Sequence, residues 1–201
     1  MNFNKFFDFI GSPSKAFDNE KKTTLGEAFK FMIFGLFILA IISTIIGVIV
    51  LAVAATFISS FMPLGIIPFG AAGAIGAGIV VMMFIGTLVG GIIASLIWGL
   101  WLHLWVYIFG SRKGLDNTFK SVFYGMSPHY ILGWIPVINI IILIWSIVVQ
   151  GIGLTKLHEI TRGKAAGAII LAIIIPVIII VAIAGTMFMS MMSLMGGIPT
   201  V

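Results

Sequence analysis

The sequence SRKGLDN, residues 111–117, is a short polar stretch that follows a long region without charge. From Phe31 to Ser111 the chain contains no Asp, Glu, Lys or Arg. One helical membrane crossing needs about 20 apolar residues, so the uncharged region is long enough for two crossings or more. The polar stretch marks the point at which the chain returns to water.

The composition of the whole chain leads to the same class of protein. Of its 201 residues, 61% are hydrophobic and 8% are charged, whereas a soluble domain carries about 25% charged residues. So few charges cannot cover a surface in water, and the sequence predicts an integral membrane protein. The chain has no cysteine, which excludes disulfides and thiolate metal sites. The net charge of +5 fits basic residues that flank membrane spans, and we do not expect nucleic-acid binding.

The apolar segments predict an all-α polytopic protein with five transmembrane helices. Residues 74–109 could form one helix of about 54 Å or two spans broken at Gly90–Gly91. Charge placement favours one helix and a short third span, because every Lys and Arg then lies in or beside three regions on one side of the membrane. That distribution places the N-terminus in the cytoplasm and the C-terminus outside. The predicted spans are residues 25–57, 74–109, 117–132, 137–154 and 165–189.

Residues 1–24 are predicted to form a cytoplasmic amphipathic arm ahead of a membrane domain of residues 25–201. Phe3, Phe6, Phe7 and Ile10 recur at helical spacing, with polar residues off that face. This pattern fits a short helix lying on the inner membrane surface. The alternative is that the aromatic face packs on the cytoplasmic end of the helical bundle.

Proline and capping residues predict where several helices begin and end. Pro13 follows Ser12 and predicts the first residue of a second short helix. Thr24 and Glu27 predict a capping box at the start of the first span. Pro128 is expected to break or kink the third span, and Pro136 is expected to open the fourth.

Polar residues inside a membrane are functional candidates by default. His103 and Tyr107 share one helix face, and His129 lies near the outer end of the third span. A metal site there would need further ligands, such as Gln150 or water, and the simpler interpretation is hydrogen bonding to neighbouring helices. Lys120 lies one turn inside the third span, from which its amine can extend back to the interface. The candidate intramembrane residues are His103, Tyr107, Lys120, His129 and Gln150.

No catalytic set is visible in the sequence, and we expect neither an enzyme nor a cofactor. All six acidic residues fall in the predicted cytoplasmic regions, and no GxSxG or HExxH motif is present. His158, in the charged loop of residues 155–164, is interpreted as a solvated residue.

Small and aromatic residues suggest how the second span packs. Gly86 and Gly90 form a GxxxG pair, which permits close packing within the subunit or between subunits. Packing within the subunit is the simpler interpretation. Trp98, Trp101 and Trp105 are interpreted as an interfacial aromatic belt.

Residues 124–165, YGMSPHYILGWIPVINIIILIWSIVVQGIGLTKLHEITRGKA, resemble the Yip family, the Ypt-interacting-protein domain. The upstream SPSKAF and the LHLWVYIFG of residues 102–110 are similar to the family as well. The likeness covers nearly the whole chain and implies a five-helix membrane domain with a cytoplasmic N-terminus. The positions that match the family pattern are Pro13, Pro128, Pro136, Trp145, Gly153, His158, Gly163 and Lys164.

The resemblance also bears on partners and location. Eukaryotic members act in traffic between the endoplasmic reticulum and the Golgi and bind Rab-type GTPases, and their cytoplasmic N-terminal region is typically long. The short arm here is more similar to bacterial and archaeal members, so we do not expect Rab binding. The implied location is the plasma membrane in a prokaryote and the endoplasmic reticulum or Golgi in a eukaryote.

Two functions follow as expectations. The first is a non-enzymatic membrane scaffold, or a protein related to trafficking, whose partners are the lipid bilayer and a second copy or another membrane protein. The alternative is a transporter or channel for a neutral or lipid-like solute, in which His103 and His129 take part.

Overall fold

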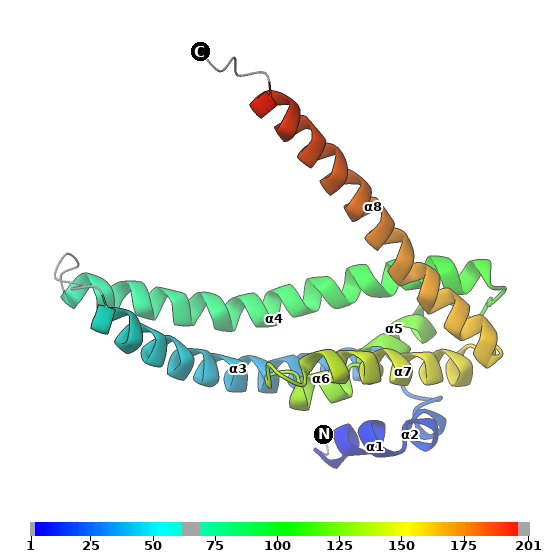
Figure 1. The fold of residues 1–201 in the computed structure, drawn as a ribbon. Helices are drawn as coiled ribbons and strands as arrows, with labels where there is room; N and C mark the ends of the chain where they lie inside the picture. Colours follow the sequence, from blue (N-terminus) through cyan, green and yellow to red (C-terminus); the bar gives the residue numbers. More distant parts are fainter. Residues whose placement is uncertain (1–2, 62–68, 197–201) are drawn as a thin grey trace.

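The computed structural model describes residues 3–61 and 69–196 of the chain. Within these ranges all regular elements are helices (Figure 1). In chain order they are α1 (Asn4–Gly11), α2 (Pro13–Asn19), α3 (Leu25–Phe61), α4 (Phe69–Ile108), α5 (Leu115–Gly125), α6 (Ser127–Leu132), α7 (Asn139–Leu157) and α8 (Arg162–Gly196). Among the described residues, α3, α4, α7 and α8 are long and apolar enough to cross a membrane. The predicted all-α, multi-pass membrane class is confirmed.

Helix α3 begins at the predicted residue, and helix α4 is one continuous helix, as predicted. The backbone N–H of Thr24 donates to the Glu27 carboxylate at 2.9 Å, and the N–H of Glu27 donates to the Thr24 hydroxyl at 3.2 Å. This reciprocal pair is the predicted capping box, and it satisfies two of the free N–H groups at the start of α3. Helix α4 is continuous through Gly90–Gly91, so the prediction of one long helix is confirmed.

The predicted third span is two short helices rather than one. Helix α5 has 11 residues and α6 has 6, and Met126 lies between them. Pro128 falls in the first turn of α6, where its missing N–H costs no helical hydrogen bond. The predicted break is confirmed. The prediction for Pro136 is wrong, because this residue lies in an exposed turn and α7 begins at Asn139.

Helix α5 forms the centre of the bundle and packs against α3, α4 and α7. All its residues from Thr118 to Gly125 are buried, although several of them are polar. The contact with α7 requires glycine, because a Cβ at Gly125 would lie 2.8 Å from the Cα of Gln150. The polar side chains of α5 are therefore surrounded by other helices and not by water.

Helix α8 belongs to the bundle over its first part only. Ala165, Ala168 and Ala172 are buried, and this part contacts α4 and α7. Beyond Pro176 the described side chains of α8, up to Ser193, are exposed. Figure 1 shows this second part diverging from the other helices. Its exposed residues are mostly apolar, as expected for a surface that faces lipid.

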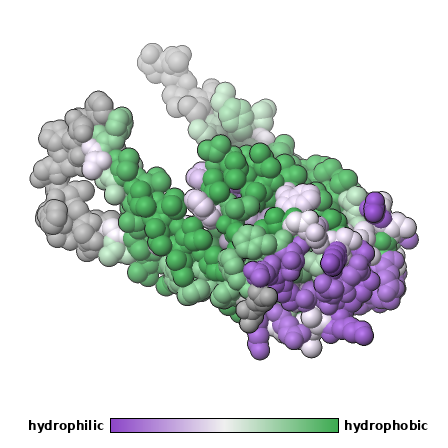
Figure 2. Space-filling view, turned by 90° about the horizontal axis from the view of Figure 1, so that it is seen from below, coloured by the Kyte–Doolittle hydropathy of each residue, from purple (hydrophilic) through white to green (hydrophobic). Residues whose placement is uncertain are grey.

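The hydrophilic residues gather at one end of the molecule (Figure 2). This charged end comprises α1, α2 and two turns, residues 109–114 between α4 and α5 and residues 158–161 between α7 and α8. Ion pairs join these parts: Lys113 to Glu159 at 2.7 Å and Lys156 to Asp18 at 2.6 Å. The three basic regions of the sequence thus come together in space.

Candidate functional site

The N-terminal arm, α1 and α2, is packed into the bundle through its aromatic residues. Phe6 and Phe9 are fully buried. The ring of Phe6 stacks on Phe31 of α3 with centroids 4.2 Å apart. Of the two arrangements expected from the sequence, the structure has the arm packed on the bundle. Of the predicted face only Phe6 is buried, and it is joined by Phe9, which was not part of that face. Phe3 and Phe7 remain 45% and 51% exposed beside it.

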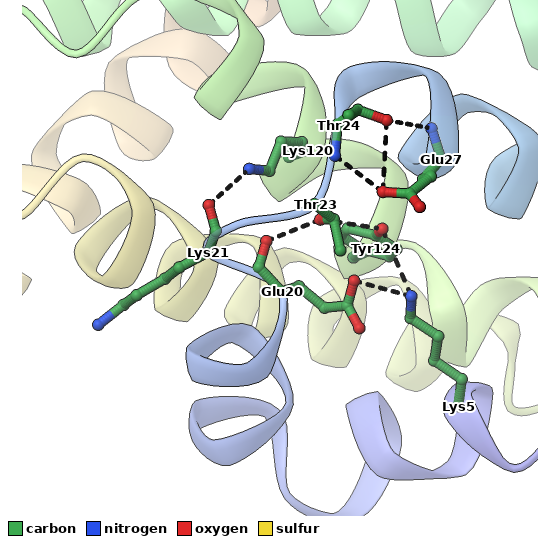
Figure 3. A network of polar contacts seen from close by, with 8 residues as sticks. All are labelled: Lys5, Glu20, Lys21, Thr23, Thr24, Glu27, Lys120 and Tyr124. Carbon is green, nitrogen blue, oxygen red and sulfur yellow. Dashed lines mark hydrogen bonds and ion pairs between the residues drawn. The ribbon is translucent and has the colours of Figure 1, made fainter.

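A polar cluster holds the arm to the start of α3 and to α5 (Figure 3). Lys5 pairs with Glu20 at 2.8 Å, and its amine lies 4.7 Å from the ring centroid of Tyr124. The Tyr124 hydroxyl donates to the Thr23 hydroxyl at 3.4 Å. A cation over an aromatic face, beside its own counter-ion, stabilises the docked arm more than an exposed ion pair does.

Lys120 completes this cluster from α5. Its side chain is buried, and its amine donates to the backbone carbonyl of Lys21 at 3.2 Å (Figure 3). The amine therefore extends toward the charged end, as predicted, but it ends on the linker between α2 and α3 rather than in water.

Helices α1 and α2 are both fastened to α7 by residues that the family resemblance singled out. The indole N–H of Trp145 donates to the carbonyl of Ile10 at 3.2 Å. A Cβ at Gly153 would lie 2.6 Å from the ring of Phe17, so glycine allows this ring to approach α7. Pro13 is buried at the start of α2, as predicted. The family pattern in α7 thus serves the docking of the arm.

The ion pair between Asp18 and Lys156 adds charge complementarity to that contact. Hydrogen bonds from Lys156, and then from Lys21, hold the pKa of the Asp18 carboxyl below its ordinary value. The carboxylate is therefore charged over a wider pH range than an isolated Asp.

A second cluster is a chain of hydrogen bonds between two histidines and two hydroxyls. The Nδ1 atom of His103 lies 2.7 Å from the Thr118 hydroxyl, which lies 3.0 Å from Nε2 of His158. The chain ends at the Ser111 hydroxyl, 2.7 Å from Nδ1 of His158. It links α4, α5 and α7 where they meet the charged end.

His158 corrects the expectation of a solvated loop residue. It is the C-cap of α7 and is only 2% exposed, because it faces α5 instead of water. Burial, together with the nearby His103, lowers the pKa of His158 to about 4. The neutral imidazole is therefore the form that fits the folded protein. The charged residues around it concealed this role in the sequence.

Two tryptophans of α4, Trp98 and Trp101, form hydrogen bonds within the protein rather than an interfacial belt. The indole N–H of Trp98 donates to Oε1 of Gln150 at 2.8 Å, and that of Trp101 donates to the carbonyl of Ala172 at 2.8 Å. The amide of Gln150 also contacts the sulfur of Met126 at 3.3 Å. The belt interpretation is wrong for Trp98 and Trp101, because both indoles are partly buried and bond to α7 and to α8.

A cavity of about 470 Å³ lies among the helices near Gln150 and Trp98. His129 and Tyr130 also line it. Among the described residues, neither Nδ1 of His129 nor the hydroxyl of Tyr130 has a hydrogen-bond partner. The structure therefore brings together two predicted candidates, His129 and Gln150, and it leaves His103 outside this cavity.

The other candidate residues lie on the surface. Tyr107 is half exposed, and the guanidinium of Arg112 lies 3.8 Å from its ring centroid. Gly163 and Lys164 are exposed in the first turn of α8. Lys164 lines a separate polar cavity of about 350 Å³ together with Lys113.

The expectation for the GxxxG pair is also corrected. A Cβ at Gly86 or Gly90 would meet no described atom of a neighbouring helix within 4 Å. Gly91, one residue further, faces α3 and contacts Leu36. The pair therefore lies on an open face of α4 instead of packing within the subunit. In the described part of the chain, no group of three or more His, Asp or Glu residues could hold a metal ion.

Comparison with known proteins places these features in one family. No curated protein and no solved structure matches the chain. The family model of the Yip1 domain matches residues 7–185, which include the arm from the middle of α1 onward, the bundle and the first two thirds of α8. The chain belongs to the Yip1 domain family.

Proposed function

We propose that this Yip1 domain protein is a non-enzymatic scaffold that shapes or organises the bilayer as an oligomer. The observation that carries the proposal is the asymmetric packing of the helices. The arm, α5 and α6 crowd beside the long helices toward the charged end, whereas beyond α6 the long helices α3, α4 and α8 continue without them (Figure 1). A protein that is broader at one membrane face than at the other favours a curved bilayer.

The proposed topology has five crossings, with the N-terminus in the cytoplasm and the C-terminus outside. Lys113 and Glu159 form an ion pair, and Ser111 bonds His158, so the ends of α4 and α7 lie side by side. If α7 crosses the membrane, α5 and α6 together must carry the chain across before it. The basic charged end is assigned to the cytoplasm by the positive-inside rule.

Exposed aromatic residues on the arm support the scaffold proposal. Phe3 and Phe7 are in edge contact, with centroids 5.5 Å apart, and both face outward. Aromatic side chains at the edge of a docked amphipathic helix insert at the boundary between headgroups and acyl chains. They would widen the molecule in the cytoplasmic leaflet alone.

The oligomer part of the proposal rests on the open face of Gly86 and Gly90. Small residues at this spacing allow two helices to approach closely in lipid. If α4 of a second copy packed on that face, it would join two molecules that are each broader at the same membrane face.

Reconstitution into vesicles tests the shape part of the proposal. We expect the protein to reduce the mean vesicle diameter in electron cryomicroscopy as its density rises. Phe3→Ala with Phe7→Ala should weaken the effect, whereas Phe188→Ala, on exposed α8, should not. Vesicles whose diameter is the same with and without protein would exclude the proposal.

A second candidate, transport of a neutral or lipid-like solute, is supported by the cavity with His129. Its lining is mostly apolar, and two side chains of that lining, His129 and Tyr130, each carry a buried polar atom without a hydrogen-bond partner among the described residues. Flux of neutral solutes into proteoliposomes tests it. His129→Ala should change the flux, and His103→Ala, outside this cavity, is the matched control. Flux equal to that of empty liposomes would dismiss this candidate.

A further inference from the structure

A groove between α7 and α8 has apolar walls. Its volume is about 900 Å³. Ile147 and Gly151 of α7 line one wall, and Ile169 and Ile170 of α8 line the other. Val148 and Ile170 are 44% and 51% exposed, so the groove faces outward from the bundle. In a membrane this side is in contact with lipid.

The mouth of the groove, at the charged end, carries positive charge and hydroxyl groups. Lys156, from the last turn of α7, and Arg162, from the first turn of α8, line it, and no acidic residue does. Arg162 forms no ion pair with any described residue, whereas Lys156 pairs with Asp18. The hydroxyls of Thr155 and Thr161 lie on the same rim.

We propose that this groove binds one anionic phospholipid. The phosphate lies at Arg162 and Lys156, and one acyl chain runs between α7 and α8 past Gly151. From Lys156 to Ile147 the wall extends about 14 Å along α7, which is enough to hold much of one acyl chain. Basic pockets between membrane helices at headgroup level select anionic lipids through this combination of charge and apolar depth.

The apolar walls of the groove distinguish binding of a phospholipid from binding of free phosphate. Free phosphate would use the rim alone, and its binding would not depend on the space beside Gly151 and Ile169. A phospholipid needs both parts at once. The inference concerns a ligand of the bundle and holds whether or not the arm bends the bilayer.

Native mass spectrometry of the full chain in a non-ionic detergent tests the inference. The protein is titrated with phosphatidylglycerol, with phosphatidylcholine of the same acyl chains and with inorganic phosphate. Arg162, whose charge no described carboxylate balances, predicts one bound phosphatidylglycerol with about fivefold preference over phosphatidylcholine, since Lys156 is already paired with Asp18. Arg162→Gln should weaken the binding of phosphatidylglycerol about fivefold. Lys22→Gln, an exposed basic residue that does not line the groove, should leave it unchanged.

A variant that fills the apolar part of the groove tests that part separately from the basic residues at its mouth. Ala166 is exposed and lines the groove, so Ala166→Phe fills the space without disturbing the buried core. This variant should lose the bound phosphatidylglycerol and keep the thermal unfolding midpoint of the wild type. Ala182→Phe, exposed further along α8 and outside the groove, is the control.

Three results would overturn the inference. The first is equal binding of the anionic and the zwitterionic lipid by the wild-type chain. The second is full retention of phosphatidylglycerol by a folded Ala166→Phe variant. The third is displacement of the lipid by inorganic phosphate at equal concentration, which would make the site one for free phosphate.

Discussion

The ring of Phe9 on α1 stacks on the ring of Tyr124 on α5, with centroids 4.9 Å apart and an angle of 10° between the planes. Both residues are fully buried. A segment at the N-terminus thus contributes to the same core as the central helix of the bundle. The arm is therefore part of the fold and does not depend on the membrane surface for its position.

Removing that ring should destabilise the whole bundle. Phe9→Ala is expected to lower the free energy of unfolding by about 3–5 kcal/mol, since a buried phenyl group leaves a cavity. Phe7→Ala, two residues away but half exposed, should change it by less than about 0.5 kcal/mol. Thermal unfolding in detergent measures both variants. Similar losses for the two would mean that the arm is not docked as described.

The ion pair of Lys5 and Glu20 should couple the arm to the linker before α3. A double-mutant cycle with Lys5→Met and Glu20→Gln is expected to give a coupling free energy of about 1 kcal/mol or more, because the pair is mostly buried beside Tyr124. The exposed pair of Lys113 and Glu159 is the control, and about 0.5 kcal/mol or less is expected there. A coupling near zero for Lys5 and Glu20 would contradict the proposed docking cluster.

Stability should fall in mild acid because of His158. Its pKa is lowered to about 4 in the folded protein, from 6.5 for an unperturbed histidine. The unfolded chain thus binds a proton that the folded chain excludes, so this stabilisation is complete above the unfolded pKa and is lost as the pH falls from 6.5 toward about 4. Thermal midpoints measured across that range should fall for the wild type.

The His158→Gln variant provides the comparison for this pH dependence. Glutamine keeps hydrogen-bonding groups for Thr118 and Ser111 but does not titrate. The variant should therefore start with a lower midpoint near neutral pH and lose less of it on acidification. An equally steep fall in both proteins would assign the effect to other groups, such as the Glu159 carboxyl, whose pKa is lowered by Lys113.

Several local signals in the sequence predicted local structure correctly, although the signal at Pro136 did not. The capping box of Thr24 and Glu27 spans one helical turn, and the break before Pro128 follows from the ring of that residue. Both depend on neighbours in the chain. The continuity of α4 followed from the distribution of charge along the whole sequence.

The misassigned residues depend on contacts between distant helices. His158 is buried because α5 lies against the end of α7, and Trp98 bonds to Gln150, 52 positions away in the chain. Neither partner can be inferred from the residues around them. The charged neighbours of His158 and the spacing of the tryptophans instead suggested a loop and a membrane belt. The same limit applies to His129, whose place in a cavity required the assembled bundle.

The open face of Gly86 and Gly90 predicts how copies of the chain associate. Gly86→Leu should block the close approach of two α4 helices, because leucine fills the space that the glycine leaves. Ala77→Leu is the control, since Ala77 is exposed on the opposite side of the same helix, at about 100° of rotation per residue. Both variants should keep the thermal midpoint of the wild type, because neither side chain faces the core.

The mass of the protein in native-lipid particles, measured by single-particle mass photometry, tests the scaffold proposal most directly. Particles of the wild type and of Ala77→Leu should contain two or more copies of the 21.6 kDa chain, and those of Gly86→Leu should contain one. Particles that hold a single wild-type chain at every protein density would contradict the proposal.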